Sequence, residues 1–589
     1  MRRRRALAFV AAGAAATLLL GACSGGGDDG GGAAADVEFN QGLTEKVNAS
    51  DAQGGTLRFA ISANMESTDP GNTYYGYIWN FSRFYARTLY TYATEPGEAG
   101  REVVPDLAAE LPEVSDDGRT WTVKLREGLK YEDGSPIVAE DIKYAIARSN
   151  FGDQALPNGP KYYQQLLDQS GDYEGPYADP DDPLAGFDAI ETPDDTTLIF
   201  HLKEPFADFT YVMVHPQSAP VPAEADKGEQ YQTRVVSSGP YKFEEDWNPG
   251  SGLSLVRNDQ WDPETDPIRK ALPDRITVEE GVEQNEIDQR LVNGGLDVDL
   301  GGTGLGPAMK GQVVTDEAEK VNLDNPENGA HYFLNLNVHV KPFDNQACRQ
   351  AVQYAINRDA VQRAWGGDIG GTIATQVLPP SIAGADPELD LYPSENNQGD
   401  IAQAEAKLEE CGEEGGFSTN MGIRSDRPAE VAAAEAVQES LARAGIEVNI
   451  KQYPSDTFTN TQAGSPDFVH ENELGINLYG WMPDWPSGYG YMSQILDGDA
   501  IKEAGNSNIS ELDDPEINKL FDEVVTIEDE AERVEIYAEI DRLVMEQAVL
   551  VPMVFHKSVL YRPDNLTNAF FNPSWKMYDY MALGTTATE

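Results

Sequence analysis

Histidine, cysteine, serine and carboxylate side chains carry most protein catalysis and metal binding, but here they form no recognised motif. No two histidines have the HExxH spacing, no pair of cysteines and pair of histidines is spaced as in a zinc finger, and no GxSxG elbow marks a nucleophilic serine. Carboxylates are so abundant that no catalytic pair can be singled out. We therefore predict that the protein is not an enzyme and that it holds no cofactor and no metal. The histidines are His201, His215, His331, His339, His470 and His556.

The glycine-rich run Gly301–Gly306 suggests a nucleotide-binding loop, but its spacing does not fit one. Counted from Gly302, the third glycine of a GxGxxG fingerprint would be Pro307, and counted from Gly304 it would be Met309. No P-loop and no EF-hand loop fits the sequence either. A large chain without catalytic signatures is more economically interpreted as a binding protein.

Acidic residues dominate the charge of the chain. The 589 residues include 100 Asp plus Glu against 43 Lys plus Arg, a formal net charge of −57. The length corresponds to two large lobes or to three or four domains, and 40 % hydrophobic residues can build sizeable cores. The acidity disfavours nucleic-acid binding and direct adsorption to anionic lipid, both of which need basic residues. We interpret it as a solvated, self-repelling surface that selects no substrate.

The N-terminus has the layout of a signal peptide. Arg2–Arg5 form a positive region, and Ala6–Leu20 form an apolar region of 15 residues. A membrane-spanning helix needs about 20 such residues, so a cleaved signal fits better than a permanent anchor. A twin-arginine signal fits the residues after the arginines poorly. No later stretch of the sequence is long and apolar enough to span a membrane.

Leu20-Gly21-Ala22-Cys23 resembles a bacterial lipobox, in which cleavage precedes the cysteine and the thiol carries lipid. Residues 1–22 are then the lipoprotein signal peptide, Cys23 is the lipidation site, and residues 23–53 are a flexible tether that begins with Gly, Ala and Asp. This predicts an extracytoplasmic protein anchored to the cell membrane by its lipid. The alternative is an ordinary secretory signal with an incidental cysteine.

Two cysteines remain once Cys23 carries lipid. An oxidising or thiol-poor compartment predicts one disulfide, between Cys348 and Cys411. The sequence does not give the distance between them, so two buried free thiols remain the alternative. A catalytic cysteine is not expected, because no histidine-containing signature surrounds either residue.

Strands that alternate with helices predict an α/β fold. Thr120–Leu125 has the alternation of a half-buried strand, and Ala139–Ser149 follows with helical spacing. Pro428–Ala444 starts with proline and stops before Gly445, and Asp529–Gln547 is amphipathic. We also expect strands at 57–59, 196–202, 241–243, 297–300, 331–340, 446–450 and 549–555, and helices at 287–293 and 345–357.

Several segments carry a resemblance to one family. Leu107–Gly118, Trp121–Lys130, Asp133-Gly134 and Ala139–Ile142 form one long signature that resembles the solute-binding family 5 of ABC importers, the dipeptide- and oligopeptide-binding proteins. The resemblance runs from about Gly54 to the C-terminus. Further matching segments are Ser238–Phe243, Arg257–Trp261, Phe333–Asn337, Pro342–Asp344, Arg349–Ala351 and Tyr354–Arg358.

The resemblance implies a two-lobed α/β fold of the type II periplasmic-binding-protein kind, with an extra subdomain in lobe I. Two hinge crossovers are expected, near His331 and near Val549, and the lobes would close over a ligand in the cleft. The implied divisions are 54–76 for the first part of lobe I, 77–191 for the subdomain, 192–325 for the rest of lobe I, 326–547 for lobe II, and 548–589 for a tail that returns to lobe I.

The resemblance also places candidate ligand-binding residues in lobe II. Gly480–Trp485 is similar to the family's cleft segment, in which an aspartate pairs with the α-ammonium of a peptide, and Asp484 takes that position. The alternative is an aspartate that caps a turn. Trp481 and Trp485 are expected to form apolar or cation–π walls, with core packing as the alternative.

Four further candidates are less specific. Tyr74 and Tyr75 follow a segment similar to the family's first cleft loop, but they are aromatic where peptide binders have acidic and small residues, which leaves the peptide class open. Thr303 lies in the Gly301–Gly306 run, where the family has a cleft loop whose backbone can approach a ligand closely, with a plain flexible loop as the alternative. Asn337 lies on the expected crossover strand.

The combined prediction is a lipid-anchored solute-binding receptor of an ABC importer. It would act as a monomer, capture di- or oligopeptides in the cleft between its lobes, and deliver them to a membrane permease and its ATPase. The alternatives are the same importer class with an oligosaccharide, opine or metal chelate, a secreted hydrolase, and a peptide-sensing lipoprotein.

Overall fold

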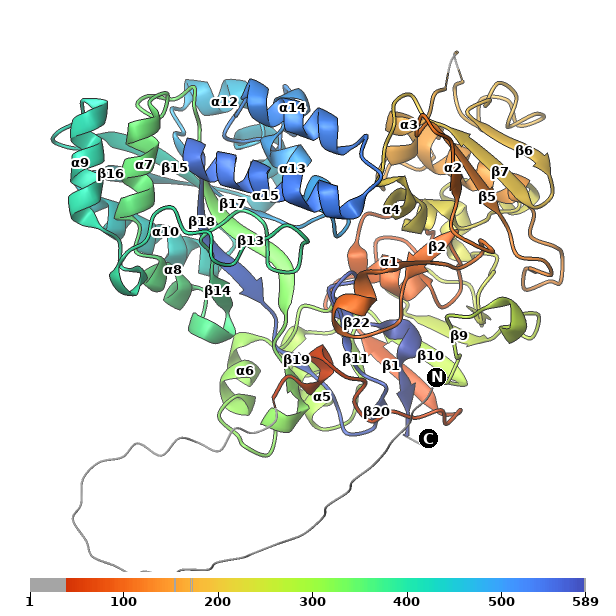
Figure 1. Cartoon of the computed structure of the whole chain (residues 1–589). Helices are drawn as coiled ribbons and strands as arrows, with labels where there is room; N and C mark the ends of the chain where they lie inside the picture. Colours follow the sequence, from red (N-terminus) through yellow and green to blue (C-terminus); the bar gives the residue numbers. More distant parts are fainter. Residues whose placement is uncertain (1–38, 153–154, 170, 172, 587–589) are drawn as a thin grey trace, which may run out of the picture. The chain divides into compact units, whose positions relative to one another are not determined.

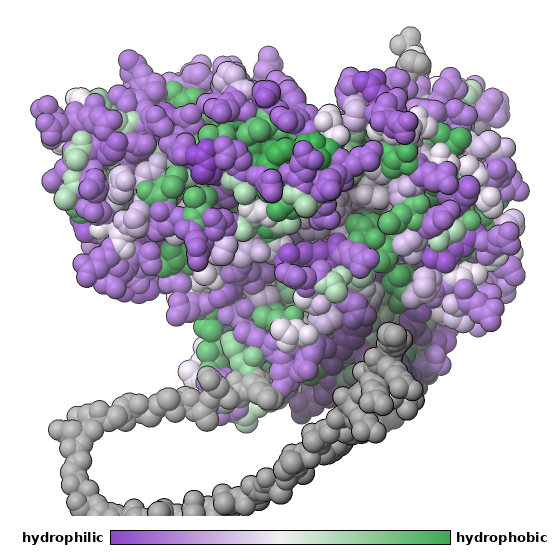
Figure 2. Space-filling model, viewed as in Figure 1, coloured by the Kyte–Doolittle hydropathy of each residue, from purple (hydrophilic) through white to green (hydrophobic). Residues whose placement is uncertain are grey.

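The computed structural model describes residues 39–152, 155–169, 171 and 173–586. The predicted signal peptide, Cys23 and the first part of the tether lie outside these residues. Across the described ranges, no helix is long and apolar enough to cross a membrane. Two large mixed sheets organise the described chain, one in each lobe (Figure 1). Hydrophilic side chains cover most of the face seen in Figure 2, in keeping with the high net charge.

Lobe II is built on a six-stranded sheet. Its strands, in sheet order, are β14 (Gly371–Ile373), β18 (Leu550–Lys557), β13 (Glu327–Leu336), β17 (Ile476–Trp481), β15 (Ser418–Arg424) and β16 (Glu447–Tyr453). The long strand β13 runs antiparallel to β17 and β18, whereas β15 runs parallel to β16 and β17. The helix α10 (Pro428–Ala442) connects β15 to β16, as a parallel pair requires.

Helices cover both faces of the lobe II sheet. They are α7 (Gln346–Ala355), α8 (Arg358–Ala364), α9 (Ile401–Cys411) and α10 on one face, and α13 (Gly488–Leu496), α14 (Pro515–Val524) and α15 (Glu530–Gln547) on the other. Because side chains alternate along a strand, Leu334 and Leu336 pack with the first group and Phe333 with the second. A disulfide between Cys348 and Cys411 joins α7 to α9, with Cα atoms 5.5 Å apart.

Lobe I is built on a five-stranded sheet. Its strands, in sheet order, are β11 (Val298–Asp299), β1 (Thr56–Ala60), β10 (Arg275–Glu279), β9 (Leu253–Arg257) and β8 (Tyr241–Phe243). The alternation in β1 buries Leu57 and Phe59 completely. The ring of Phe59 lies 5.4 Å from that of Phe81 and 5.1 Å from that of Tyr580. The first strand and the C-terminal segment therefore meet in one core.

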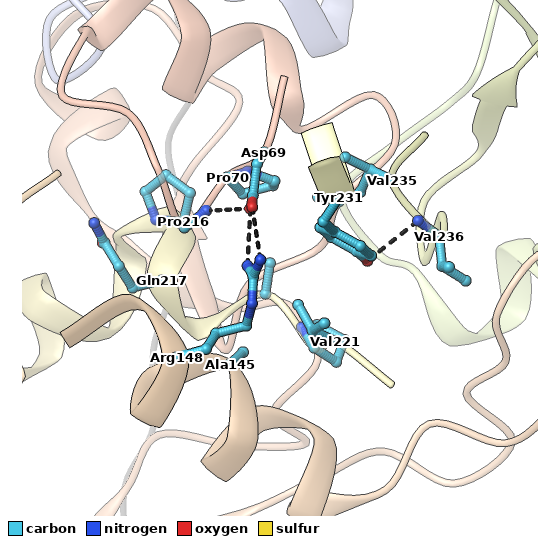
Figure 3. A pocket seen from close by; sticks show the side chains of 14 residues that line it. Asp69, Pro70, Ala145, Arg148, Pro216, Gln217, Val221, Tyr231, Val235 and Val236 are labelled. Atoms are coloured by element: carbon cyan, nitrogen blue, oxygen red, sulfur yellow. Dashed lines mark hydrogen bonds and ion pairs between the residues drawn. The ribbon is translucent and has the colours of Figure 1, made fainter. Parts of the chain in front are cut away.

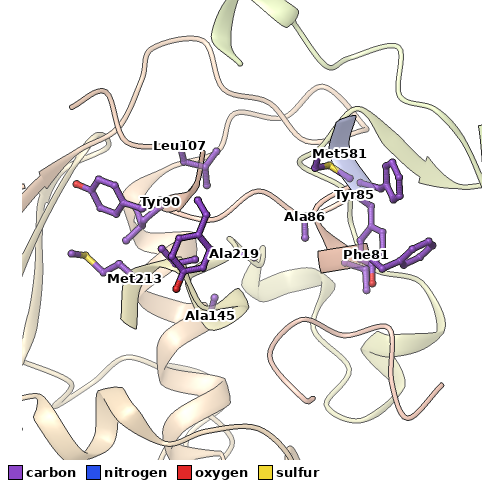
Figure 4. Packing of buried hydrophobic residues seen from close by; sticks show 14 of the residues in the cluster. Phe81, Tyr85, Ala86, Tyr90, Leu107, Ala145, Met213, Ala219 and Met581 are labelled. Carbon is purple, nitrogen blue, oxygen red and sulfur yellow. The ribbon is translucent and has the colours of Figure 1, made fainter. Parts of the chain in front are cut away.

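A four-stranded sheet is the second large sheet of lobe I. In sheet order its strands are β4 (Glu113–Val114), β5 (Thr120–Lys124), β7 (Thr197–His201) and β6 (Ile190–Asp194). The helices α2 (Ala139–Phe151) and α3 (Tyr162–Leu166) lie between β5 and β6 in the chain. The strands β2 (Tyr90–Tyr92) and β3 (Val103–Pro105) pair in a separate two-stranded sheet. Trp121 and Val123 of β5 are buried. Figure 4 shows Ala145 of α2 in the same hydrophobic cluster as Phe81 and Met581. The subdomain therefore shares its core with the rest of lobe I.

The chain passes between the lobes twice. β12 (Leu323–Asp324) pairs with β19 (Leu560–Tyr561) in lobe I, while β13 pairs with β18 in lobe II. The passages therefore lie after β12 and after β18. They run together, because the backbone N–H of Ser558 donates to the carbonyl of Pro326 at 3.1 Å and the side chain of Asn325 donates to the carbonyl of Ser558 at 3.0 Å.

The observed strands correct parts of the predicted division of the chain into lobes and a subdomain. The prediction puts one crossover near Val549 and assigns 548–589 to the lobe I tail, but β18 is an inner strand of the lobe II sheet. The other expected crossover position, His331, lies inside β13. The predicted end of the subdomain at 191 falls within β6, which pairs with β7 through Ile190 and Phe200. The described part of the predicted tether, residues 39–53, packs against lobe I instead: the N–H of Gly42 donates to Asp324 at 2.9 Å, and the N–H of Val47 donates to the carbonyl of Ala569 at 2.9 Å. The other divisions of the chain stay predictions.

Most expected helices and strands are present, with shifts at their ends. The expected strand 331–340 ends at Leu336, because Asn337 turns the chain by accepting a hydrogen bond from the N–H of His339 at 3.0 Å. The expected helix 345–357 ends at Ala355, and Asn357 instead caps the next helix, α8, which begins at Arg358. The other elements are α1 (Gly76–Ser82), α4 (Phe209–Val214), α5 (Gln284–Val292), α6 (Pro307–Val313), α11 (Ser455–Thr457), α12 (Pro466–Glu471), β20 (Leu566–Thr567), β21 (Phe571–Asn572), β22 (Met577–Tyr578) and β23 (Gly584–Thr585).

Candidate functional site

A cavity of about 530 Å³ is lined by residues of both lobes. Its volume lies within the range of small-molecule sites, roughly 300–1,000 Å³. Aromatic rings make up much of its wall. The lining comes from segments within 74–79, 214–216 and 301–303 of lobe I, from 479–484 and Asn328 of lobe II, and from Tyr92 and residues 574–577.

The end of β17 brings lobe II to the cavity. Gly480 lies opposite Tyr332 of β13, and a Cβ atom on Gly480 would come within 2.5 Å of the tyrosine ring. Only glycine allows this close approach of strand and ring. β17 ends at Trp481, and Met482–Asp484 then continue along the cavity wall.

Asp484 provides the carboxylate of the site. Among the described residues that line the cavity, it is the only Asp or Glu. The hydroxyl of Tyr74 donates to its Oδ1 at 2.7 Å, and the Tyr74 hydroxyl oxygen lies 3.2 Å from that of Tyr162. Burial raises the pKa of Asp484, while the two tyrosine hydroxyls and the ammonium of Lys576 oppose the rise. Hydroxyls from lobe I therefore orient a carboxylate from lobe II.

A buried ion pair supports the loop that carries Tyr74. Arg148 of α2 donates to both carboxylate oxygens of Asp69, at 3.1 and 2.9 Å (Figure 3). The same guanidinium pairs with Asp226 at 3.0 Å and lies 4.9 Å from the centre of the Tyr231 ring. Bidentate pairing fixes geometry as well as charge. The segment from Asp69 to Tyr74 is therefore held against α2.

Lys576 reaches the same wall from the C-terminal segment. It lies in the turn between β21 and β22, and its Nζ donates to the carbonyl oxygen of Pro483 at 2.5 Å. Burial lowers the pKa of Lys576 to about 8, and Asp484 opposes that change. Of the described residues that line the cavity, it is the only Lys or Arg. The sequence prediction missed it, because no motif or spacing surrounds it.

An aromatic cluster around His215 forms the lobe I wall. His215 follows α4, and its ring centre lies 4.7 Å from that of Trp79 and 5.3 Å from that of Tyr162. Burial lowers the pKa of His215 to about 3, so the ring is neutral at neutral pH. It therefore presents an uncharged surface to the cavity. A lone histidine gives no signal in the sequence, and the prediction did not include it.

Four of the seven predicted ligand-binding residues line the cavity. The indole of Trp481 donates to the carbonyl of Tyr491 at 2.9 Å, which fixes the ring at the end of β17. The hydroxyl of Thr303 donates to Asp299 at 3.0 Å. The four lining residues are Tyr74, Thr303, Trp481 and Asp484.

Trp485 is not among the described residues that line the cavity. It is 6 % exposed and belongs to the hydrophobic cluster of lobe I, with its ring 5.3 Å from that of Tyr162 and 6.1 Å from that of Phe206. Its indole N–H donates to Asp208 of lobe I at 2.7 Å. Instead of the predicted ligand wall, Trp485 makes a contact between the lobes.

Tyr75 and Asn337 also lie outside the cavity lining. Tyr75 is 49 % exposed, and its ring lies 5.5 Å from that of Tyr77. Asn337 is buried just past the end of β13, where its side-chain amide donates to the carbonyl of Ile509 at 2.9 Å and to Glu511 at 2.7 Å. Asn337 therefore satisfies polar groups inside lobe II.

The architecture defines the class of protein. Each of the two lobes has a central mixed sheet, the chain passes between the lobes twice, and both lobes line the cavity. This is the fold of the type II periplasmic binding proteins. The chain belongs to the bacterial extracellular solute-binding proteins, family 5, whose model matches residues 102–503. It is therefore a solute-binding protein of ABC importers.

Individual relatives extend the comparison. The chain is 40 % identical to the solved clavulanic acid biosynthesis oligopeptide binding protein 2, with a TM-score of 0.89, and the match covers 94 % of this chain and 99 % of that one. It is 28 % identical over 482 residues to the glutathione-binding protein GsiB of Shigella boydii serotype 4 (strain Sb227), which covers 80 % of this chain and 84 % of the relative. AgaA of A. tumefaciens R10, solved with agropinic acid, is 20 % identical with a TM-score of 0.64 over 91 % of this chain and 99 % of its own, and shares the fold.

Proposed function

We propose that this protein captures di- or oligopeptides and passes them to an ABC permease and its ATPase. Asp484 carries this proposal, because it presents a half-buried carboxylate at the cavity wall. Such a group binds a ligand ammonium well, since charge-assisted hydrogen bonds strengthen away from bulk water. The rings of Trp79, His215 and Trp481 supply uncharged walls for the rest of the ligand.

The names of two relatives support a peptide. One is an oligopeptide binding protein and the other a glutathione-binding protein. A non-peptide solute such as an opine is the second candidate. It is favoured by Tyr74, whose hydroxyl contacts Asp484. This residue places an aromatic ring where the peptide-binding members of the family have acidic and small residues.

The peptide proposal is tested by binding to purified protein that lacks residues 1–22. We expect calorimetry and native mass spectrometry to show binding of di- to tetrapeptides with free amino termini, and much weaker binding of their N-acetylated forms. Asp484→Asn should lower the affinity for free-amine peptides by roughly 10- to 150-fold, because a hydrogen bond to a charged group contributes about 1.5–3 kcal/mol. Asp522→Asn, an exposed aspartate of α14, is the matched control.

The outcomes separate the two candidates. Unchanged affinity for free-amine peptides in Asp484→Asn, with the same melting temperature as the wild type, would refute the role of Asp484. If the wild-type protein binds no peptide but releases an opine or sugar on denaturation, the second candidate is correct.

We also propose that lipid on Cys23 anchors the protein outside the cytoplasm and that it acts as a monomer. The sequence Leu20-Gly21-Ala22-Cys23 supports the anchor. Cys23→Ser should move the protein from the membrane fraction to the soluble fraction of a bacterial host, and its mass should lack the lipid. A variant that stays in the membrane would contradict the anchor, and a dimer in light scattering of the soluble form would contradict the monomer.

A further inference from the structure

Lys576 is a half-buried ammonium group at the cavity wall that lacks an ionic partner in the described protein. Its hydrogen bond goes to a backbone carbonyl, that of Pro483 at 2.5 Å. Within the described ranges, no carboxylate lies close enough to Nζ for an ion pair, although Asp484 is near enough to influence its pKa. A carbonyl dipole compensates a buried charge only in part.

The burial of the Lys576 ammonium has an energetic cost. Burial lowers the pKa of Lys576 to about 8, which reflects the unfavourable removal of its charge from water. A buried charge is stabilised when a counter-ion with good geometry reaches it. The cavity beside Lys576 is the place from which such an anion can come.

The charges around the cavity point to the kind of anion. Its described lining contains one ammonium, Lys576, and one carboxylate, Asp484, while burial keeps His215 neutral. Since Lys576 bonds to the carbonyl of the residue just before Asp484, the two charges lie on the same stretch of wall. Electrostatic complementarity then favours a solute with one positive and one negative group close together in space.

We propose that Lys576 binds a carboxylate of the ligand, so that the site selects zwitterions whose ammonium lies at Asp484 and whose carboxylate lies at Lys576. This inference rests on the proposed function and narrows it to short ligands. Two sources supply the same chemistry, namely the two ends of a dipeptide and the amino-acid head group of a γ-glutamyl compound such as glutathione. A long extended peptide cannot place both of its termini on one short stretch of wall.

The test compares carboxylates with amides. Wild-type protein, Lys576→Met and Lys576→Arg are titrated with a pool of free-acid dipeptides, the same pool as C-terminal amides, and glutathione. We expect the wild type to bind acids at least tenfold more tightly than amides, Lys576→Met to abolish this preference, and Lys576→Arg to restore most of it. A purely structural contact with Pro483 would instead weaken acids and amides equally, so the ratio of the two affinities distinguishes the roles.

Three results would overturn the inference. The first is a wild type that binds dipeptide acids and amides equally, and the second is a Lys576→Met protein that keeps the preference for acids; both leave the proposed function intact. The third is a wild type that binds neither pool nor glutathione, which would overturn the proposed function as well. Tight binding of glutathione alone, lost in Lys576→Met, supports the inference with the head group as the source, and tight binding of dipeptide acids supports it with the two termini.

Discussion

Two aspartates mediate contacts between the lobes, and their surroundings differ. Asp484 of lobe II accepts a hydrogen bond from Tyr74 of lobe I at the cavity wall. Asp208 of lobe I accepts hydrogen bonds from the indole of Trp485 and the hydroxyl of Ser487, both of lobe II. Asp208 is only 3 % exposed. One turn of lobe II thus makes both an open polar contact and an enclosed one.

From this difference we expect Asp484 to serve ligand recognition and Asp208 to serve closure of the lobes. The groups around Asp208 come from the protein itself, and the neighbouring backbone adds a further contact between the lobes, from the N–H of Ala207 to the carbonyl of Val525 at 2.8 Å. Burial raises the pKa of Asp208, while Ser487 and Trp485 oppose the rise. Because these contacts need no ligand, we expect them to favour the closed arrangement equally for every ligand. Asp484 should instead discriminate between ligands.

The largest expected effect comes from Asp208→Ala. Removing the carboxylate leaves two buried donors without their acceptor, and each hydrogen bond to a charged group contributes about 1.5–3 kcal/mol. We expect closure to weaken by about 3 kcal/mol, which lowers affinity roughly 150-fold for free-amine peptides, N-acetylated peptides and amides alike. Titration calorimetry with each class measures the affinities, and small-angle scattering should show a larger radius of gyration without ligand.

A matched pair of variants sharpens this expectation. Asp208→Asn keeps one side-chain oxygen as an acceptor, so its loss of affinity should lie between those of the wild type and Asp208→Ala. Selective loss of free-amine peptides in Asp208→Ala, the pattern expected for Asp484→Asn, would show that Asp208 and Asp484 do not have separate roles.

The turn that carries Asp484 shows how far a motif predicts a site. The segment Gly480–Trp485 resembles the family's cleft segment, and Trp481 and Asp484 do line the cavity. The resemblance predicts Trp485 beside them. The chain turns after β17, however, and Trp485 enters the core of lobe I just before α13 begins. Residue type and spacing do not determine which way a side chain points after a turn, because packing against the other lobe decides it.

Other parts of the site left no signal in the sequence. Lys576 contacts Pro483 across 93 residues of chain, and His215, which follows α4, contacts Tyr162 of α3. Such contacts arise only from tertiary structure. The same limit applies to β18, since its apolar run predicts a strand but cannot say which sheet the strand joins. Local patterns therefore predicted the elements better than their partners.

A smaller effect is expected from His215, which lies between the two aspartate contacts. Its ring lies 5.3 Å from Tyr162 on the Asp484 side and 6.3 Å from Trp485 on the Asp208 side. Burial lowers its pKa from 6.5 to about 3. Between these values the unfolded chain binds a proton that the folded protein excludes, so stability falls as the pH falls. At about 1.4 kcal/mol per pH unit, the loss at pH 5 is about 2 kcal/mol.

Urea unfolding at pH 7, 6 and 5 measures this slope. His215→Gln should reduce the pH dependence by one proton, whatever it does to stability at pH 7. His331 of β13 is a matched residue, because burial lowers its pKa to about 3 as well, and His331→Gln should remove one further proton. If only His331→Gln changes the slope, His215 takes up protons in the folded protein. The aromatic wall would then be open to water, and His215 would belong with Asp484 on the ligand side of the contact between the lobes.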